Sequence, residues 1–398
     1  MTTPHDVTAT DGPPLGVTSP AGFRAAGVTA GLKRSGRSDL AVVHNIGPRH
    51  DAAVVLTSNR VAAAPVHLTR QAVADGVLRA IVLNSGGANA CTGEAGMADA
   101  RAMAQATATA LDLAADDVAV CSTGLIGTRL PMDLVSAGIT DACRTLSEDG
   151  GADAARAIMT TDTRAKQAGH RAAAGWTIGA MAKGAGMLAP GLATMLVVIT
   201  TDAVVPAEIG QRALAEATRV TFDRLDSDGC MSTNDTVALL ASGASGEEPP
   251  ESEFTAALTA VCHDLAQQLL SDAEGASHDI AVTVRGAISE DEAVVVARSV
   301  ARSNLLKCAV FGSDPNWGRV LASVGTTDAT FDPDQLDVSF NGVKVCRGGA
   351  IGEDRSLVDL SPRAVTIDIE LYAGDASATV WTNDLTYDYV KENAEYST

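Results

Sequence analysis

Short apolar runs alternate with amphipathic segments along the whole chain, and this alternation limits the fold more than any other feature of the sequence. Residues 52–56 and 80–83 are continuous apolar runs of the length of buried strands, whereas the Ala-rich residues 97–111 have the pattern of a helix. The chain has 398 residues, of which 46% are hydrophobic, and this is enough to bury a large core. We therefore predict an α/β or α+β fold.

The later part of the chain carries the clearest local patterns. Apolar residues recur at helical intervals through residues 254–269, directly after a helix-breaking Pro-Pro pair, which predicts a helix. Apolar and polar residues alternate through residues 280–284 and again through residues 365–371, as in strands that have one face on a core. We expect an antiparallel sheet in the C-terminal third, and the polar residues 242–253 predict an exposed loop.

The charge of the chain limits its ligands. Lys and Arg number 29 and Asp and Glu number 49, which gives a formal net charge of −20 at pH 7. A surface of this charge repels phosphate backbones, so we expect no nucleic-acid partner. An acidic substrate would also be repelled at long range, and its site would need cations of its own. Individual Lys and Arg residues are therefore informative in this sequence.

Neither a membrane segment nor a metal site is predicted. The first residues lack the basic start and apolar stretch of a secretory signal, and no apolar run approaches the ~20 residues that cross a bilayer. The seven Cys residues occur singly, without a CxxC pair, and the seven His residues are scattered. We expect a soluble cytoplasmic protein with reduced thiols, no bound metal and no cofactor.

The most informative junction is a Gly-rich loop, KGAGMLAPGLA, that runs into Thr194 and then directly into an apolar strand. The loop does not match the phosphate-binding glycine patterns. In a tight turn, the Thr194 hydroxyl can attack the carbonyl of Ala193 and exchange the amide for an ester. Hydrolysis would free the α-amine of Thr194, a group of ordinary pKa ~7.7–8.0 that suits a base acting on its own hydroxyl. The alternative is that Thr194 only opens the strand.

The same loop, extended to KGAGMLAPGLATML, resembles the cleavage and nucleophile motif of the ArgJ family, the ornithine acetyltransferases or glutamate N-acetyltransferases. Further blocks that resemble this family occur along the chain: GVTSPAGFRAAGVTAGLK, NSGGANACTG, STGLIG, TTDT, DGCMSTNDT, SDPNWGR and the terminal ENAEYST. They run in order from about residue 16 to residue 398, so the resemblance covers almost the whole chain.

The resemblance implies a fold and a division of the chain. The fold would be an N-terminal-nucleophile-type α/β sandwich, similar to DmpA and ArgJ proteins, with a smaller C-terminal α/β subdomain. Residues 1–15 would be a loose tail, residues 16–278 the catalytic core, and residues 279–398 the subdomain, whose tail would return to the active site.

The resemblance also implies the chemistry. Self-cleavage between Ala193 and Thr194 would separate an α chain, residues 1–193, from a β chain, residues 194–398. Thr194 would then carry acetyl from N2-acetyl-L-ornithine to L-glutamate through an acetyl-Thr194 ester, in a ping-pong reaction of the cyclic arginine pathway. Some family members also accept acetyl-CoA as a donor substrate. The αβ units would assemble as dimers or tetramers.

Individual residues receive roles from the resemblance. Thr123 and Gly124 would form the oxyanion hole. The substrate-binding residues would be Thr160, with Thr161 as the near alternative, Lys183, Thr194, Glu274, Asn393 and Thr398. Lys183 would supply the local cation that the acidic surface requires, and Glu274 would hold a substrate ammonium. The sequence departs from the family at His278, where a Lys is usual, and at Gly87, where an Asn is common.

Two other functions fit parts of the same pattern. An N-terminal-nucleophile aminopeptidase or amidase of related fold would use the same Thr194 but would pass the acyl group to water. A catalytically silent amino-acid-binding protein would keep the pocket and would never mature. The acceptor of the acyl group separates the first alternative from the acetyltransferase, and chain cleavage separates the second.

Overall fold

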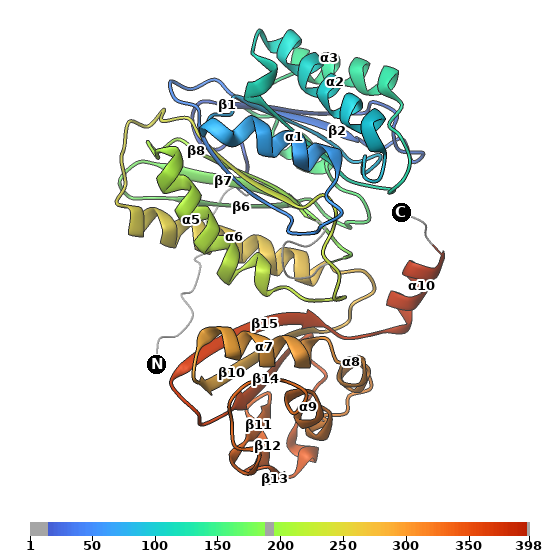
Figure 1. Cartoon of the computed structure of the whole chain (residues 1–398), viewed down its shortest axis with the longest axis vertical. Coiled ribbons are helices and arrows are strands. Elements are labelled where there is room, and N and C mark those ends of the chain that lie inside the picture. The colour runs from blue at the N-terminus through green and yellow to red at the C-terminus, as the bar shows by residue number, and fades with distance from the viewer. Residues whose placement is uncertain (1–14, 188–194, 396–398) are drawn as a thin grey trace.

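Two β-sheets face each other in the N-terminal part of the chain, and helices cover their outer sides (Figure 1). The computed structural model describes residues 15–187 and 195–395. The four-stranded sheet has the order β1 (Phe23–Val28), β2 (Leu40–Asn45), β4 (Ala80–Asn84) and β5 (Val118–Ser122). The five-stranded sheet has the order β3 (Asp51–Leu56), β9 (Thr236–Ala241), β8 (Leu196–Thr201), β7 (Thr177–Lys183) and β6 (Lys166–Arg171).

The packing of buried side chains defines the layers. Residues of both sheets, among them Val43 and Val198, form a core between the sheets, which also takes in α4 (Gly151–Ala157). The outer side of the four-stranded sheet is covered by α2 (Gly93–Leu111) and α3 (Met132–Arg144), and that of the five-stranded sheet by α5 (Ala207–Val220) and α6 (Glu251–Ser271). Helix α1 (Ala64–Ala72) is bound to β5 through the Thr69 hydroxyl. The α/β class predicted from the sequence is confirmed.

This layering explains the apolar runs in the sequence. A strand that is covered on both faces has no solvent side, so its residues do not alternate between apolar and polar. All residues of β8 are buried, and so are those of β4 and β5. The predicted strands at 52–56 and 80–83 correspond to β3 and β4, and the predicted helices at 97–111 and 254–269 correspond to α2 and α6.

The C-terminal part of the chain forms a separate sheet with its own core. Its order is β13 (Ala350–Ile351), β12 (Val343–Arg347), β11 (Asp337–Phe340), β14 (Ala364–Glu370), β10 (Asp279–Ala287) and β15 (Ala376–Asn383). Helices α7 (Glu290–Ala301), α8 (Asn304–Phe311) and α9 (Trp317–Val324) supply the other side of that core.

The antiparallel sheet expected in the C-terminal third is confirmed in four strand pairs, but one central pair is parallel. β10 and β14, the two strands that the alternating pattern revealed, pair in parallel, whereas β10 pairs with β15 and β11 with β14 in the antiparallel sense. Alternation reports that one face of a strand is buried, and this holds for either direction of pairing. The end of the predicted loop 242–253 also differs, because α6 begins at Glu251.

After β15 the chain leaves the C-terminal sheet, and α10 (Tyr387–Glu395) stands apart from it (Figure 1). The Thr386 hydroxyl donates a 2.6 Å hydrogen bond to the carbonyl oxygen of Gly275, which follows α6. This bond holds the start of α10 against the end of α6. Among residues 15–187 and 195–395, no helix has both the length and the apolar character needed to cross a membrane.

Candidate active site

The pairing of three strands creates the candidate site at the start of β8. Leu196, the first residue of β8, pairs with Lys183 at the end of β7 and with Thr236 at the start of β9. Because β9 runs parallel to β8, the loop before Thr236 lies at the same end of the sheet as the start of β8. The sheet register therefore brings Lys183 and the residues that precede Thr236 to the place where the Gly-rich loop enters β8.

The predicted cleavage site, Ala193 and Thr194, lies outside the described residues, and Met195 is the first described residue after it. The Met195 N–H donates a 3.0 Å hydrogen bond to Asp235 Oδ1. Asp235 is fully buried and also accepts from the Ser232 N–H at 3.1 Å. Burial raises the pKa of Asp235 well above its ordinary value. Asp235 was missed in the sequence, although it lies in the block DGCMSTNDT.

The structure brings the predicted residues together in one small pocket of about 120 Å³. Its lining includes Thr123, Gly124, Thr160, Lys183, Glu274 and Asn393, and also Thr161, the alternative to Thr160. These residues come from β7 and α10 and from loops of distant parts of the chain, so the pocket exists only in the folded protein. Thr398 lies outside the described residues.

Thr123 and Gly124 follow β5 in a backbone shape that requires glycine. Gly124 has a φ of +131°, and a Cβ on it would lie 2.8 Å from the Gly87 nitrogen. The Gly87 N–H donates to the Thr123 carbonyl at 3.0 Å, so the two loops pack backbone to backbone. Within the described residues the Gly124 N–H has no hydrogen-bond partner. A buried Thr123 hydroxyl beside a free N–H is the arrangement that can stabilise a negative oxygen.

Asn234 fixes the base of this loop. Its side-chain amide donates to the carbonyl oxygens of Ala88 at 2.6 Å and of Ser122 at 2.9 Å. Asn234 therefore joins the strand end before Thr123 to the loop that contains Gly87. It also precedes Asp235, so one short segment positions both the candidate oxyanion hole and the residue after the predicted nucleophile.

Lys183 is completely enclosed at the centre of the site. Its ammonium lies 3.3 Å from Thr123 Oγ1 and donates to it. Burial lowers the pKa of Lys183. The negative charge of Asp162, and to a smaller extent those of Asp235 and Glu274, raise this pKa. The sequence argument expected a local cation at this position, and the structure places that cation against the Thr123 hydroxyl.

A buried ion cluster supports Thr160. Lys166 Nζ lies 2.6 Å from Asp162 Oδ1 and 2.5 Å from Asp272 Oδ2. Asp162 also accepts from the backbone N–H groups of Thr160 at 2.9 Å and Gly184 at 2.7 Å. Burial would raise the pKa of Asp162, but Lys183, Lys166 and the Gly184 N–H outweigh it and lower the pKa to about 2. Asp162 thus stays ionised and ties Thr160 to the end of β7.

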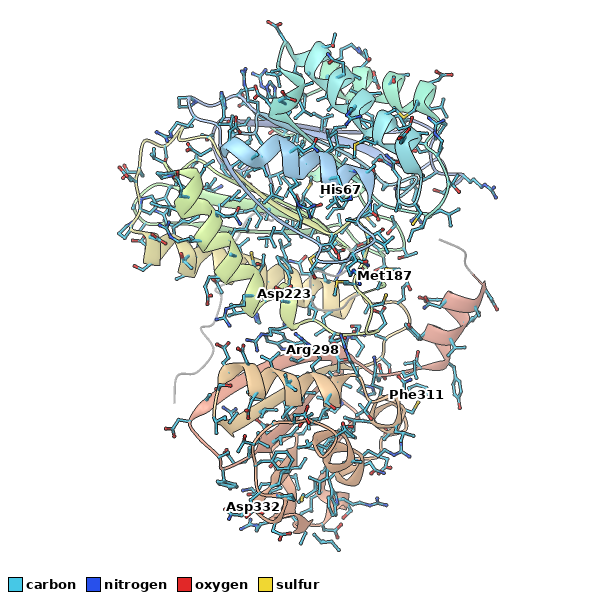
Figure 2. All side chains as sticks on the ribbon, in the orientation of Figure 1. His67, Met187, Asp223, Arg298, Phe311 and Asp332 are labelled. Atoms are coloured by element: carbon cyan, nitrogen blue, oxygen red, sulfur yellow. The ribbon has the colours of Figure 1, made fainter. Side chains whose placement is uncertain are left out.

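Glu274 lies beside the loop that leads to the predicted cleavage site. A Cβ on Gly186 would come within 2.6 Å of Glu274 Oε2, and the Glu274 N–H donates to the Ala185 carbonyl at 2.9 Å. Met187, the residue after Gly186, is labelled in Figure 2 and ends the described part of this loop. Its N–H donates to Asp228 Oδ2 at 2.6 Å, and burial raises the pKa of Asp228 to about 6.

His278 stands where the ArgJ family usually has a Lys, and its side chain makes two polar contacts outside the pocket. His278 Nδ1 lies 2.7 Å from Asp384 Oδ2, and Nε2 lies 3.0 Å from the Leu360 carbonyl oxygen. The contact with Asp384 joins the segment after α6 to the segment after β15, and the contact with Leu360 joins it to the segment before β14. Across the two described stretches, no group of three or more His, Cys, Asp or Glu residues is arranged to hold a metal ion.

Comparison with known proteins gives a consistent match. A family model described as the ArgJ family matches residues 24–398. The arginine biosynthesis bifunctional protein ArgJ of Thermobifida fusca is 62% identical over 384 residues, covering 96% of this chain and 100% of the relative. The protein of that name from Streptomyces coelicolor is 61% identical over 387 residues, with 96% and 100% covered. A solved ornithine acetyltransferase from Mycobacterium tuberculosis, complexed with ornithine, is 54% identical over 46% of this chain and 96% of that chain, with a TM-score of 0.44. The chain belongs to the ArgJ family.

Proposed function

We propose that this ArgJ-family acyltransferase moves an acetyl group from N2-acetyl-L-ornithine to L-glutamate through an ester on Thr194. The observation that carries the proposal is the pocket that unites Thr123, Gly124 and Lys183 near the start of β8. The names of the relatives, which refer to arginine biosynthesis, support the same pathway for this chain. The proposed steps use protein groups and water alone.

Maturation would come first. Thr194 Oγ attacks the carbonyl carbon of Ala193, the peptide C–N bond breaks as the ester C–O bond forms, and the released nitrogen takes the hydroxyl proton. Water then hydrolyses the ester and leaves a carboxylate on Ala193 and a free amine on Thr194. Asp235 supports this exchange by accepting a hydrogen bond from the N–H of Met195, the residue that stays bonded to Thr194 after cleavage.

Acetyl transfer would then use the freed amine as the base. It takes the proton of the Thr194 hydroxyl as the oxygen attacks the acetyl carbon of the donor. The negative oxygen of the tetrahedral intermediate receives hydrogen bonds from the Thr123 hydroxyl and the Gly124 N–H. The C–N bond breaks, and the leaving ornithine amine takes the proton back from the Thr194 ammonium. Glutamate reverses the sequence: its amine attacks the ester and regenerates the hydroxyl.

The remaining pocket residues would orient these steps. Because Lys183 donates to Thr123 Oγ1, the hydrogen of that hydroxyl stays available for the oxyanion. Glu274 offers a carboxylate to the ammonium of ornithine. Thr160 and Asn393 line the same pocket and are proposed to bind the polar groups of the substrates.

The Thr194→Ala variant tests maturation and transfer together. We expect the unaltered protein to give two chains on a denaturing gel, the second beginning Thr-Met-Leu by N-terminal sequencing. The variant should remain one chain and should transfer no acetyl. Normal cleavage of the variant, or active protein that shows only the original N-terminus, would contradict the proposal.

The acceptor distinguishes the transferase from a hydrolase. Ornithine release from N-acetylornithine should depend on glutamate, and equal release without glutamate would favour an amidase. Acetyl-CoA in place of N-acetylornithine tests whether this enzyme uses a second donor. An uncut chain that binds substrate without transfer would favour an amino-acid-binding protein. We also propose dimers or tetramers of αβ units, which the native mass would reveal.

A further inference from the structure

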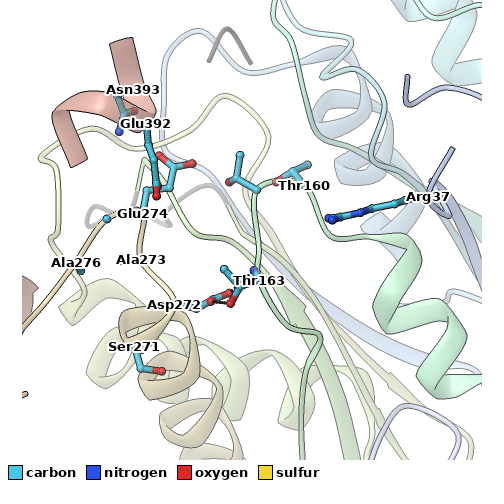
Figure 3. Close-up of a pocket in the computed structure, with 12 residues that line it drawn as sticks. Arg37, Thr160, Thr163, Ser271, Asp272, Ala273, Glu274, Ala276, Glu392 and Asn393 are labelled. Atoms are coloured by element: carbon cyan, nitrogen blue, oxygen red, sulfur yellow. Dashed lines mark hydrogen bonds between the residues drawn. The ribbon is translucent and has the colours of Figure 1, made fainter. Parts of the chain in front are cut away.

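A larger chamber of about 590 Å³ adjoins the reaction pocket, and the function of most of its lining is not yet assigned. The two cavities share Thr160, Thr161, Glu274 and Asn393. Figure 3 shows the labelled residues that line the chamber. A substrate that places its α-amine beside the oxyanion hole therefore has room to extend its side chain across these shared residues into the chamber.

The charges of the chamber are separated between two sides. Glu274 and Glu392 lie together on the left in Figure 3, and Arg37 lies on the right, beyond Thr160. Burial raises the pKa of Glu392, and the nearby Glu274 raises it further. The third carboxylate, Asp272, is already paired with Lys166. Glu274 and Glu392 thus place two like charges on one side of the cavity.

Arg37 is the chamber's basic side chain among the residues that the structure describes. It is exposed and has no ion-pair partner within the described residues. Lys183 lines the smaller pocket and donates to Thr123 instead. In a chain of net charge −20, an unpaired guanidinium on a cavity wall is a ready site for a carboxylate.

The backbone that carries Arg37 is tied to the backbone that carries Thr160. Lys33 Nζ donates to the Ser38 carbonyl at 2.7 Å and to the Met159 carbonyl at 2.6 Å, next to Arg37 and Thr160 respectively. Buried Asp39 holds the same loop by accepting three backbone N–H groups. The guanidinium therefore extends from a fixed point on the wall, although its side chain reaches solvent.

The proposed reaction requires one site to recognise two different substrates, and the separation of charges across the chamber allows this. Its two amino acids bind in turn at one site, and their side chains carry opposite charges. We propose that Arg37 determines specificity for the acceptor by binding the side-chain carboxylate of glutamate, while Glu392 joins Glu274 in receiving the terminal ammonium of the donor. This inference rests on the proposed function and adds two residues to its binding site.

The two half-reactions allow each residue to be tested separately. In a ping-pong enzyme, labelled ornithine exchanges into N-acetylornithine without glutamate, and labelled glutamate exchanges into N-acetylglutamate without ornithine. Arg37→Gln should raise KM for glutamate roughly 10- to 100-fold and leave KM for ornithine within about 2-fold. Arg37→Lys should recover part of the loss. Glu392→Gln should raise KM for ornithine roughly 3- to 10-fold and should not raise KM for glutamate.

Arg34→Gln is the matched control, because it removes the same charge from the same exposed loop outside the chamber. It should change neither exchange. An equal rise of the glutamate KM in Arg34→Gln and Arg37→Gln would assign the effect to the overall field and overturn the proposal. A normal glutamate KM in Arg37→Gln, or equal damage to both exchanges, would also overturn it. Failure of the unaltered protein to catalyse either exchange would instead refute the proposed function.

Discussion

The ammonium of Lys183 lies 3.3 Å from the hydroxyl oxygen of Thr123, and both side chains are almost completely buried. The two residues come from different sheets, since Lys183 ends β7 and Thr123 follows β5. Their contact therefore joins the facing layers of the sandwich at the candidate site. A cation that occupies one lone pair of this oxygen leaves the hydroxyl hydrogen available to donate into the pocket, which is the property an oxyanion donor needs.

Loss of the Thr123 hydroxyl should slow chemistry and leave the fold intact. Thr123→Val keeps the shape of the side chain but removes the donor, and we expect kcat to fall roughly 10²- to 10³-fold. Thr123→Ser keeps the donor and should stay within about 10-fold of the unaltered enzyme. The rate of ornithine release checks both variants. Full activity in Thr123→Val would exclude this hydroxyl from the oxyanion hole.

A side chain at Gly124 should deform the same site. The φ of +131° and the 2.8 Å approach to the Gly87 nitrogen both oppose a Cβ, so Gly124→Ala should cost roughly 1–3 kcal/mol of stability and most of the activity. Gly127→Ala is the matched control, because Gly127 has a φ of +83° but has nothing within 4 Å of its would-be Cβ. Urea unfolding and acetyl transfer should separate the two variants. Equal activities would show that contact with Gly87 has no role.

The position of α10 should control substrate binding. Gly275 has a φ of +62°, and a Cβ there would overlap the backbone nitrogen of Tyr389. Gly275→Ala should displace α10 with Asn393 and raise KM for N-acetylornithine several-fold. Gly246→Ala has a similar strain, with a φ of +74° and open space around its would-be Cβ, and should leave KM unchanged. A normal KM in Gly275→Ala would mean that α10 does not hold the substrate.

Asp228 should make stability depend on pH. Because its pKa is raised from 3.8 to about 6, the folded state binds this proton more tightly than the unfolded state. The group therefore weakens stability as pH rises from about 4 to about 6, and the full cost remains above that range. Asp228→Asn keeps an acceptor for the Met187 N–H and should add roughly 1–3 kcal/mol at pH 8 but little at pH 4. Urea unfolding in the Thr194→Ala background measures the difference, and an equal gain at both pH values would contradict it.

The sequence predicted those parts of the structure that depend on local pattern. The strands β3 and β4 are apolar because they are buried, and α6 repeats apolar residues because one of its faces is buried. The pattern could not give the direction of β10 relative to β14, since both directions bury the same face. It also could not give the helix ends, where α6 extends beyond residues 254–269 at both ends.

The candidate site was predicted chiefly through the resemblance, and the missed residues show why. Asp235 acts through the parallel pairing of β8 with β9, which joins residues far apart in the sequence. Arg37 belongs to none of the recognised blocks, and the bond that ties its loop to the residue before Thr160, between Lys33 and the Met159 carbonyl, joins residues far apart in the sequence. Asp162 lies inside the block TTDT, where its spacing from Lys166 was a local signal that could have been read.

In the five-stranded sheet, β8 and β9 are inserted between β3 and β7. Along the chain, residue 194 comes before β8 and β9 but after β3 and β7. A break before residue 194 would therefore leave two polypeptides whose strands are hydrogen-bonded to each other in one sheet. We expect dilution not to drive them apart, because separation would strip the β8–β9 pair of its partners on both edges, β7 beside β8 and β3 beside β9, and β8 is buried along its whole length. The severed molecule should therefore melt in one cooperative step, and neither piece should fold when it is made alone.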